Sequence, residues 1–110
     1  MPLTMHSSLE GQVATLTLVG ELDGNSAPAV RSAVEDLISA NPSRLVLAVE
    51  HLTFLSSAGL RILIFAKQRH PTLQLYLEKP RDVIVDTLKN TGFYDSVYVV
   101  DGTERAIGAA

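Results

Sequence analysis

The chain contains no cysteine, few aromatic residues and no cluster of basic residues. Without cysteine it can form no disulfide, no thiolate metal site and no cysteine nucleophile. The three histidines, His6, His51 and His70, lie far apart in the sequence and lack the spacing of metal ligands. We therefore expect the protein to need neither a metal nor another cofactor.

Charge and hydropathy argue against two further kinds of partner. The net charge is −3 and the nine basic residues are spread along the chain, so the sequence offers no basic patch for nucleic acid. No stretch approaches the roughly 20 apolar residues that cross a bilayer. The opening MPLTMHSSLE lacks the charged start and apolar core of a signal peptide. The sequence predicts a cytoplasmic protein that neither binds nucleic acid nor inserts into a membrane.

The pattern that is present is that of one α/β domain over residues 1–110. A chain of 110 residues, 46% of them hydrophobic, is long enough for a single core. Alternation and helical periodicity predict strands at 5–9, 13–19, 45–49, 72–78 and 97–100, and helices around 28–40, 60–69, 80–91 and from Thr103 to the end. Because helices alternate with strands after an opening hairpin, we expect a mixed, mainly parallel sheet of four to five strands with about four helices.

The stretch FLSSAGLR, residues 54–61, joins an apolar strand to an apolar helix. Open α/β sheets carry their functional residues at such strand ends, and a helix N-terminus favours an anion such as phosphate. One serine is enough to cap the helix. The second serine and the small Ala58 and Gly59 suggest a turn that a partner can approach.

A catalytic serine is a weaker interpretation of the same stretch. Residues 55–59 match only half of the G-x-S-x-G elbow, because Leu55 stands where the first glycine is needed. His51 and Asp23 could be offered as base and orienting residue, but no oxyanion loop and no P-loop motif is visible. We therefore expect no enzymatic activity.

The helix at 60–69 is apolar around most of its circumference. Helical spacing allows Leu60, Leu63 and Ile64 to cover the sheet, which leaves Ile62, Phe65 and Ala66 to face something else. They are either buried by neighbouring helices or form a docking patch with Arg61 at its rim.

Four segments together resemble a known family: GELD at 20–23, SAPAVRSAVEDL after it, FLSSAGLRIL, and NTGFYDSVYVVDGTERAI near the end. They are similar to the bacterial anti-sigma factor antagonists, which are stand-alone STAS domains. The resemblance implies the STAS fold and a function in transcription regulation by partner switching, in which the antagonist binds an anti-sigma factor and is released when a serine is phosphorylated.

The resemblance also implies specific partners and site residues. The kinase is the anti-sigma factor itself, a serine kinase of the histidine-kinase ATPase type, and a PP2C-type phosphatase removes the phosphate. By motif position the acceptor is Ser57, with Ser56 as a rival where many relatives carry an acidic residue. The implied partner-binding residues are Asp23, Asn25, Ser56, Ala58, Gly59, Arg61, Ile62 and Phe65. The alternative is a STAS subunit of a lipid- or sulfate-transport complex, in which the serine is not switched.

Overall fold

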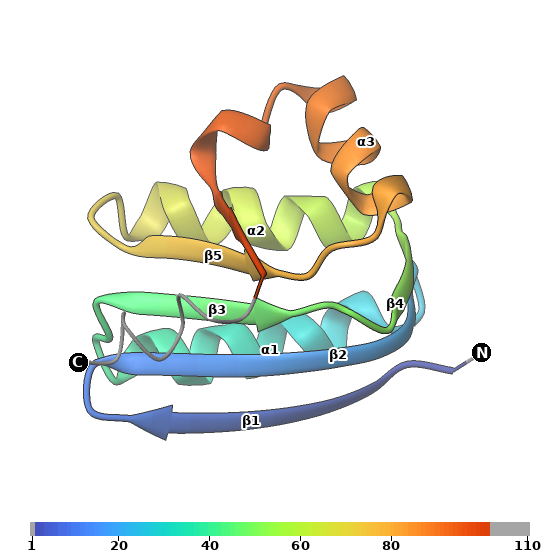
Figure 1. Cartoon of the computed structure of the whole chain (residues 1–110). Coiled ribbons are helices and arrows are strands. Elements are labelled where there is room, and N and C mark those ends of the chain that lie inside the picture. The colour runs from blue at the N-terminus through green and yellow to red at the C-terminus, as the bar shows by residue number, and fades with distance from the viewer. Residues whose placement is uncertain (1, 102–110) are drawn as a thin grey trace.

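The computed structural model describes residues 2–101. Its elements are β1 Thr4–Glu10, β2 Val13–Leu22, α1 Ala27–Ser39, β3 Arg44–Ala48, β4 Leu52–Leu55, α2 Ser57–Arg69, β5 Gln74–Glu78, α3 Asp82–Thr91, the 3-10 helix η1 Tyr94–Ser96 and β6 Tyr98–Val100. The main path of the sheet runs β1-β2-β3-β5-β6, and β4 pairs with β2 off this path. Figure 1 shows α1 and α2 side by side on one face of the sheet.

The sheet is mixed, as the sequence predicts. The β1–β2 hairpin is antiparallel, and all other strand pairs are parallel. The core-facing residues of β2, β3 and β5 are mostly leucines that are almost fully buried beneath the helices, among them Leu16, Leu45, Leu47, Leu75 and Leu77. Each such side chain contributes roughly 1.5–3 kcal/mol when it is fully buried.

Strand β2 is long because it pairs with two partners in turn. Residues 13–17 pair with β3, and residues 20–22 pair with β4 after a register shift between Gly20 and Glu21. Gly20 makes this change possible with a φ of 109°, and its amide donates to the carbonyl of His51 at 3.0 Å. A side chain here would also meet the carbonyl oxygen of Pro2 at 2.6 Å. The first glycine of the GELD motif therefore has a structural reason to be glycine.

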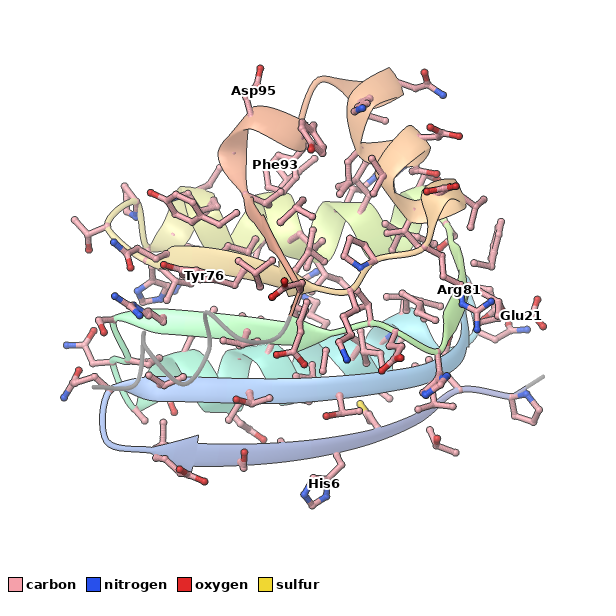
Figure 2. The ribbon with its side chains drawn as sticks, in the orientation of Figure 1. His6, Glu21, Tyr76, Arg81, Phe93 and Asp95 are labelled. Carbon is pink, nitrogen blue, oxygen red and sulfur yellow. The ribbon has the colours of Figure 1, made fainter. Side chains whose placement is uncertain are left out.

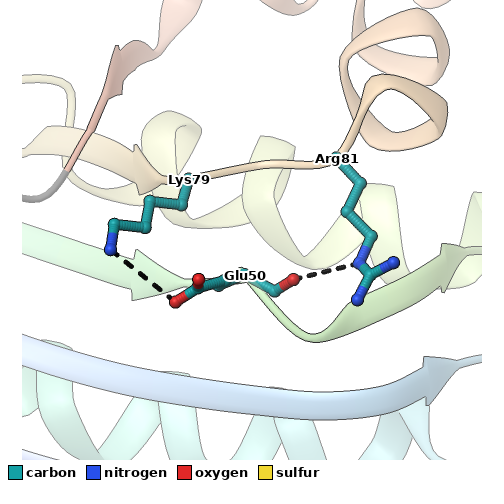
Figure 3. A network of polar contacts seen from close by, with 3 residues as sticks. All are labelled: Glu50, Lys79 and Arg81. Carbon is teal, nitrogen blue, oxygen red and sulfur yellow. Dashed lines mark hydrogen bonds and ion pairs between the residues drawn. The ribbon is translucent and has the colours of Figure 1, made fainter.

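Two polar contacts fix the turn between β3 and β4 to the segment that leads into α3. The Nε of Arg81 donates to the carbonyl oxygen of Glu50 at 3.0 Å, and the Nζ of Lys79 lies 3.8 Å from Oε1 of Glu50 (Figure 3). The segment before β4 is thus held near the carboxyl end of β2.

The structure corrects the expected element count. The described residues form six strands instead of four to five, because residues 52–55 form β4 and not a connection. Residues 2–101 hold three α-helices, and the fourth expected helix, from Thr103, lies outside the described residues. Helix α2 begins at Ser57, three residues earlier than expected. The other expected strands and helices are confirmed with small changes of their bounds.

Candidate functional site

The turn between β2 and α1 is built by reciprocal hydrogen bonds between Asp23 and Ser26. The amide of Asp23 donates to Oγ of Ser26 at 2.9 Å, and the amide of Ser26 donates to Oδ1 of Asp23 at 3.0 Å. The amide of Asn25 donates to the same carboxylate oxygen at 3.0 Å. Because these donors favour the ionised form, the backbone and then the side chain of Ser26 lower the pKa of Asp23 below its usual value. Asp23 therefore holds a fixed negative charge at neutral pH.

A second turn, between β4 and α2, is capped by the first serine of FLSSAGLR. The side chain of Ser56 accepts a hydrogen bond from the amide of Gly59 at 3.1 Å, which is the usual arrangement of an N-cap residue. The amide of Ser56 donates to the carbonyl of Leu22 at 2.8 Å, so the turn is also tied to the end of β2. Ser56 is half-buried and its hydroxyl is already used.

Ser57 is the first residue of α2 and is exposed. Among residues 2–101, no side chain or backbone group forms a hydrogen bond with its hydroxyl. The first-turn amides of the helix lie beside it, and they carry the partial positive charge of the helix N-terminus. An exposed hydroxyl in this position is accessible for modification, and the helix end favours an anion there.

The two turns lie next to each other because their strands are paired. Leu22 and Leu55 are register partners, and Asp23 and Ser56 are the residues that follow them. The parallel pairing therefore places the start of α1 and the start of α2 at the same edge of the sheet. Figure 2 shows Glu21 and Arg81 at this edge, near the ends of β2 and β4.

Gly59 lies inside the protein, where α2 packs against the two strands. A Cβ atom at this position would lie 2.6 Å from Cγ of Leu22 and 2.9 Å from Cδ1 of Leu55. The small residue is therefore needed for close packing of helix and strands, whereas the sequence had suggested a backbone open to a partner. A direct contact of Gly59 with a partner stays a prediction, and its burial argues against it.

A groove runs between α1 and α2 and begins next to the two turns. Its wider part has a volume of about 560 Å³ and is lined by Gly24, Ala27, Pro28, Arg31, Ala58, Arg61, Ile62, Ile64, Phe65 and Gln68. A narrower part of about 250 Å³ continues toward the carboxyl ends of both helices. The ring of Phe65 lies 4.6 Å from the guanidinium of Arg31 and 5.3 Å from that of Arg69. The groove thus combines an apolar floor with a charged rim, on which Arg31 also pairs with Glu35 at 3.5 Å.

Of the two interpretations of α2, burial by a neighbouring helix is the one that Ile62 and Ala66 confirm, whereas Ile64, expected to cover the sheet, is only half-buried. Ile62 and Ala66 are buried together with Leu60 and Leu63, whereas Ile64 and Phe65 are half-exposed. The reason is that α2 packs against α1 as well as against the sheet, so the side chains that face α1 are covered. Ile62 still forms part of the groove floor, and Arg61 is exposed at its rim.

Sequence reasoning missed two residues of this region. Arg31 of α1 lines both parts of the groove, but helical periodicity does not say which flank of α1 faces α2. Phe54 is 44% exposed on β4, two residues before the Ser56 cap. Phe54 is the apolar residue that opens FLSSAGLR, and the sequence alone suggests that such a residue is buried in the core. Only the short strand β4 shows that it is exposed.

The alternative of a catalytic serine depends on contacts of His51 and Asp23 with the serine turn. The imidazole of His51 is exposed on the β3–β4 turn, and among residues 2–101 it makes no hydrogen bond with Ser56 or Ser57. The Asp23 carboxylate accepts hydrogen bonds from its own turn.

No group of three metal-ligating side chains occurs within the described part of the chain. None of the described helices is both long and apolar enough to span a bilayer.

Comparisons with known proteins give a family match and a partial match to one relative. Residues 8–108 match the STAS domain family. The anti-sigma-F factor antagonist RsfB of Mycobacterium tuberculosis (strain CDC 1551 / Oshkosh) is 35% identical over 57 residues, which are 52% of this chain and 47% of that protein. The match thus spans about half the length of this relative.

Solved structures resemble the whole fold. An anti-sigma factor antagonist from Mycobacterium paratuberculosis superimposes with a TM-score of 0.85 and 21% identity, over 98% of this chain and 93% of that one. A sulfate transporter family protein from Wolinella succinogenes superimposes with a TM-score of 0.73 and 17% identity, over 92% of this chain and 86% of that one. At these identities the likeness is one of fold.

Proposed function

Because this chain belongs to the STAS domain family, we propose that it is an anti-sigma factor antagonist that works by partner switching. In its unmodified form it binds an anti-sigma factor in the cytoplasm, and phosphorylation of Ser57 releases it. The anti-sigma factor is the kinase, of the histidine-kinase ATPase type, and a PP2C-type phosphatase restores the binding form. The name of the mycobacterial relative RsfB supports the role, over the half of its length that matches.

The observation that carries the proposal is the different state of the two serines. Ser56 is half-buried and its hydroxyl caps α2, whereas Ser57 is exposed and its hydroxyl is uncommitted within residues 2–101. A kinase must bring the acceptor oxygen to the γ-phosphate of ATP, which an exposed first-turn residue allows. A phosphate on Ser56 would have to form at the same oxygen that accepts from the Gly59 amide. These contrasts support Ser57 over Ser56 as the acceptor.

The surroundings explain how a phosphate at Ser57 would act on a partner. A phosphoserine adds about −1.5 to −2 charges and three acceptor oxygens. The helix N-terminus tolerates this charge, so the fold of the antagonist need not change. The fixed negative charge of Asp23 stands on the adjacent strand end. Before modification this surface fits the partner. After modification the two anions repel the partner or lose their solvation in the interface.

We propose that the partner binds over the two turns and the wide part of the α1–α2 groove. Asp23 and Asn25 supply the rim on the β2 side, and Ser56, Ala58 and Arg61 supply the rim on the α2 side. Phe65 and Ile62 supply the apolar floor. Gly59 acts indirectly, because it lets α2 approach the strands closely enough to bring the two rims together.

The test is binding of Ser57 variants to the cognate anti-sigma factor, measured by calorimetry. Ser57→Ala should bind as the wild type does, and Ser57→Asp should bind at least about tenfold more weakly, a change of about 1.4 kcal/mol. Ser32→Asp is the matched control, because it adds the same charge to an exposed serine of α1. Equal binding by Ser57→Ala and Ser57→Asp would contradict the switch.

A second candidate has its own observation. The likeness to the sulfate transporter family protein shows that this fold also occurs outside sigma regulation. In that case the chain is a STAS subunit of a lipid- or sulfate-transport complex and Ser57 is not modified. Mass spectrometry of the protein from its native cells distinguishes the two: phosphate on Ser57 favours the antagonist, and its absence under all growth and stress conditions favours the subunit.

A further inference from the structure

Strand β1 forms an open edge of the sheet. Among the described residues its only strand neighbour is β2, with which residues 4–10 pair without a register shift. All seven residues of β1 are exposed, and Figure 1 shows the strand at the margin of the sheet, beyond α1. The outer side of β1 therefore presents a row of backbone N–H and C=O groups to solvent.

This edge lacks the features that usually keep sheet edges apart. Natural edge strands are protected by lysines, prolines, bulges or very short length. Between Thr4 and Leu9 the strand TMHSSL has no formally charged residue at neutral pH and no proline, and its register with β2 is regular. Only Glu10, at the end of the strand, carries a charge. The edge can therefore accept another strand.

One side of β1 is also apolar. Met5 and Leu9 are 39% and 46% exposed, and they pair with Leu18 and Ala14, which face the helix-covered core. They consequently project on the side of the sheet that carries α1, and α1 contacts β1. On α1, Arg31 and Glu35 line the groove toward α2. Helical geometry then places Ala33 and Leu37, both half-buried, on the flank toward β1. The four apolar side chains, Met5, Leu9, Ala33 and Leu37, form what we call the β1 ledge.

We propose that a second copy of this chain pairs with β1 in antiparallel orientation, with Ser7 on the twofold axis. The sequence of the strand is self-complementary in this register. Met5 of one copy lies opposite Leu9 of the other, on the ledge side, and His6 lies opposite Ser8 on the other side. Glu10 lies opposite Thr4, so no two formal charges of the same sign face each other. The pairing joins the two sheets into one and covers both ledges.

The expected dimer is weak and reversible. A stable interface usually buries about 1,200–2,000 Å² in total, and two paired strands of seven residues with a small apolar ledge bury less than that. Association should therefore rise with concentration and not be permanent. The edge contains none of the residues proposed to bind an anti-sigma factor. The inference consequently stands whether or not the proposed function is correct.

The first test is sedimentation equilibrium of the full chain with paired charge variants. Met5→Lys/Leu9→Lys and Met5→Glu/Leu9→Glu should each lose self-association, because like charges then face each other twice across the axis. An equimolar mixture should regain it, because each lysine then faces a glutamate. Val83→Lys, which charges an exposed apolar residue on α3, should associate as the wild type does. Circular dichroism checks that all variants remain folded.

Three results of this experiment would overturn the proposal. A wild-type chain that stays monomeric up to about millimolar concentration, where weak encounters of Kd near 1 mM become visible, has no such interface. A double-lysine variant that associates like the wild type uses another surface. A mixture that stays monomeric excludes the register in which residue 5 faces residue 9.

The second test uses the absence of cysteine, since a single introduced cysteine is then the only thiol. Across an antiparallel pair directly opposed Cα atoms are about 4.5–5.5 Å apart, within the range that a disulfide requires. Ser7→Cys should therefore cross-link rapidly under mild oxidation. Ser8→Cys should not, because its two copies are offset by two residues along the strand, and Ser32→Cys on α1 is a second control. Equal cross-linking of all three variants would mean random collision and would contradict the proposed axis.

Discussion

Asp23 has a charge that its own turn stabilises. Hydrogen bonds from Ser26 and Asn25 lower its pKa, so in the folded state it binds its proton less readily than in the unfolded chain. The ionised Asp23 therefore stabilises the folded state fully above the usual pKa of an aspartate, about 3.9. This stabilisation is lost as the pH falls through the lower pKa of Asp23 in the folded state. We expect the wild type to be more stable than Asp23→Asn at neutral pH, with a difference that narrows in acid.

Urea unfolding at a series of pH values measures this difference. The matched control is Asp86→Asn, because Asp86 is an exposed aspartate on α3. The difference in free energy of unfolding between the wild type and Asp86→Asn should change less with pH than the difference between the wild type and Asp23→Asn. A gap between wild type and Asp23→Asn that stays constant down to about pH 2, well below the usual aspartate range, would show that the ionised carboxylate does not stabilise the turn.

Gly59 allows a second prediction at a single residue. Alanine at a helical position is by itself about 1 kcal/mol more favourable than glycine. At this site, however, the added Cβ would lie 2.6 Å from Cγ of Leu22, so the neighbours must move. Overpacking of this kind costs typically about 1–3 kcal/mol, and we expect Gly59→Ala to be less stable than the wild type by roughly 1 kcal/mol. Gly24→Ala, where no atom lies within 4 Å of the added Cβ, is the control. Equal or greater stability of Gly59→Ala in urea unfolding would contradict the close packing.

The hydroxyl of Ser56 caps the start of helix α2, whereas the hydroxyl of Ser57 makes no hydrogen bond within residues 2–101. Replacing the N-cap residue Ser56 by alanine removes the bond to the Gly59 amide and should cost about 1 kcal/mol. Ser57→Ala should change the free energy of unfolding by less than about 0.5 kcal/mol, because its hydroxyl is exposed and makes no bond within residues 2–101. Thermal unfolding of both variants checks this. A larger loss for Ser57→Ala than for Ser56→Ala would reverse the assignment of the two serines.

The elements differ in how well the sequence predicts them. The β1–β2 hairpin and α3 follow from alternation, periodicity and the glycine that ends α3, Gly92 with a φ of 79°. Strand β4 is missed because four residues, two buried and two exposed, give no usable period. The serine turn is predicted because a capping residue between an apolar strand and an apolar helix is a local signal. The faces of α2 are predicted only in part, since the sequence leaves open whether a neighbouring helix buries Ile62 and Ala66, and the packing of α1 against α2 decides it.

At the scale of the whole molecule, the pairing of β2 with two successive partners brings the site together. Because β4 pairs with the end of β2, the helices that follow these two strands, α1 and α2, begin next to each other. The Asp23 turn, the Ser56 cap and the open groove then lie at the carboxyl ends of β2 and β4, while β1 forms the lateral edge of the sheet beside β2 (Figure 1). A partner at these strand ends and a second copy at β1 consequently use separate surfaces.

This separation leads to a prediction about phosphorylation. A phosphate on Ser57 changes a net charge of −3 by about −1.5 to −2, but it does so at a helix N-terminus that favours anions. We expect amide chemical shifts to change at the ends of β2 and β4 and in the first turn of α2, and to stay unchanged along β1 and β5. The free energy of unfolding should change by less than about 0.5 kcal/mol, as for most surface substitutions. Two-dimensional NMR of the phosphorylated chain, with Ser32→Asp as the charge control, measures both the extent and the place of the change. Shifts that spread through β1 and β5 would mean that the phosphate rearranges the fold, and release of the partner would then follow from a conformational change instead of local repulsion.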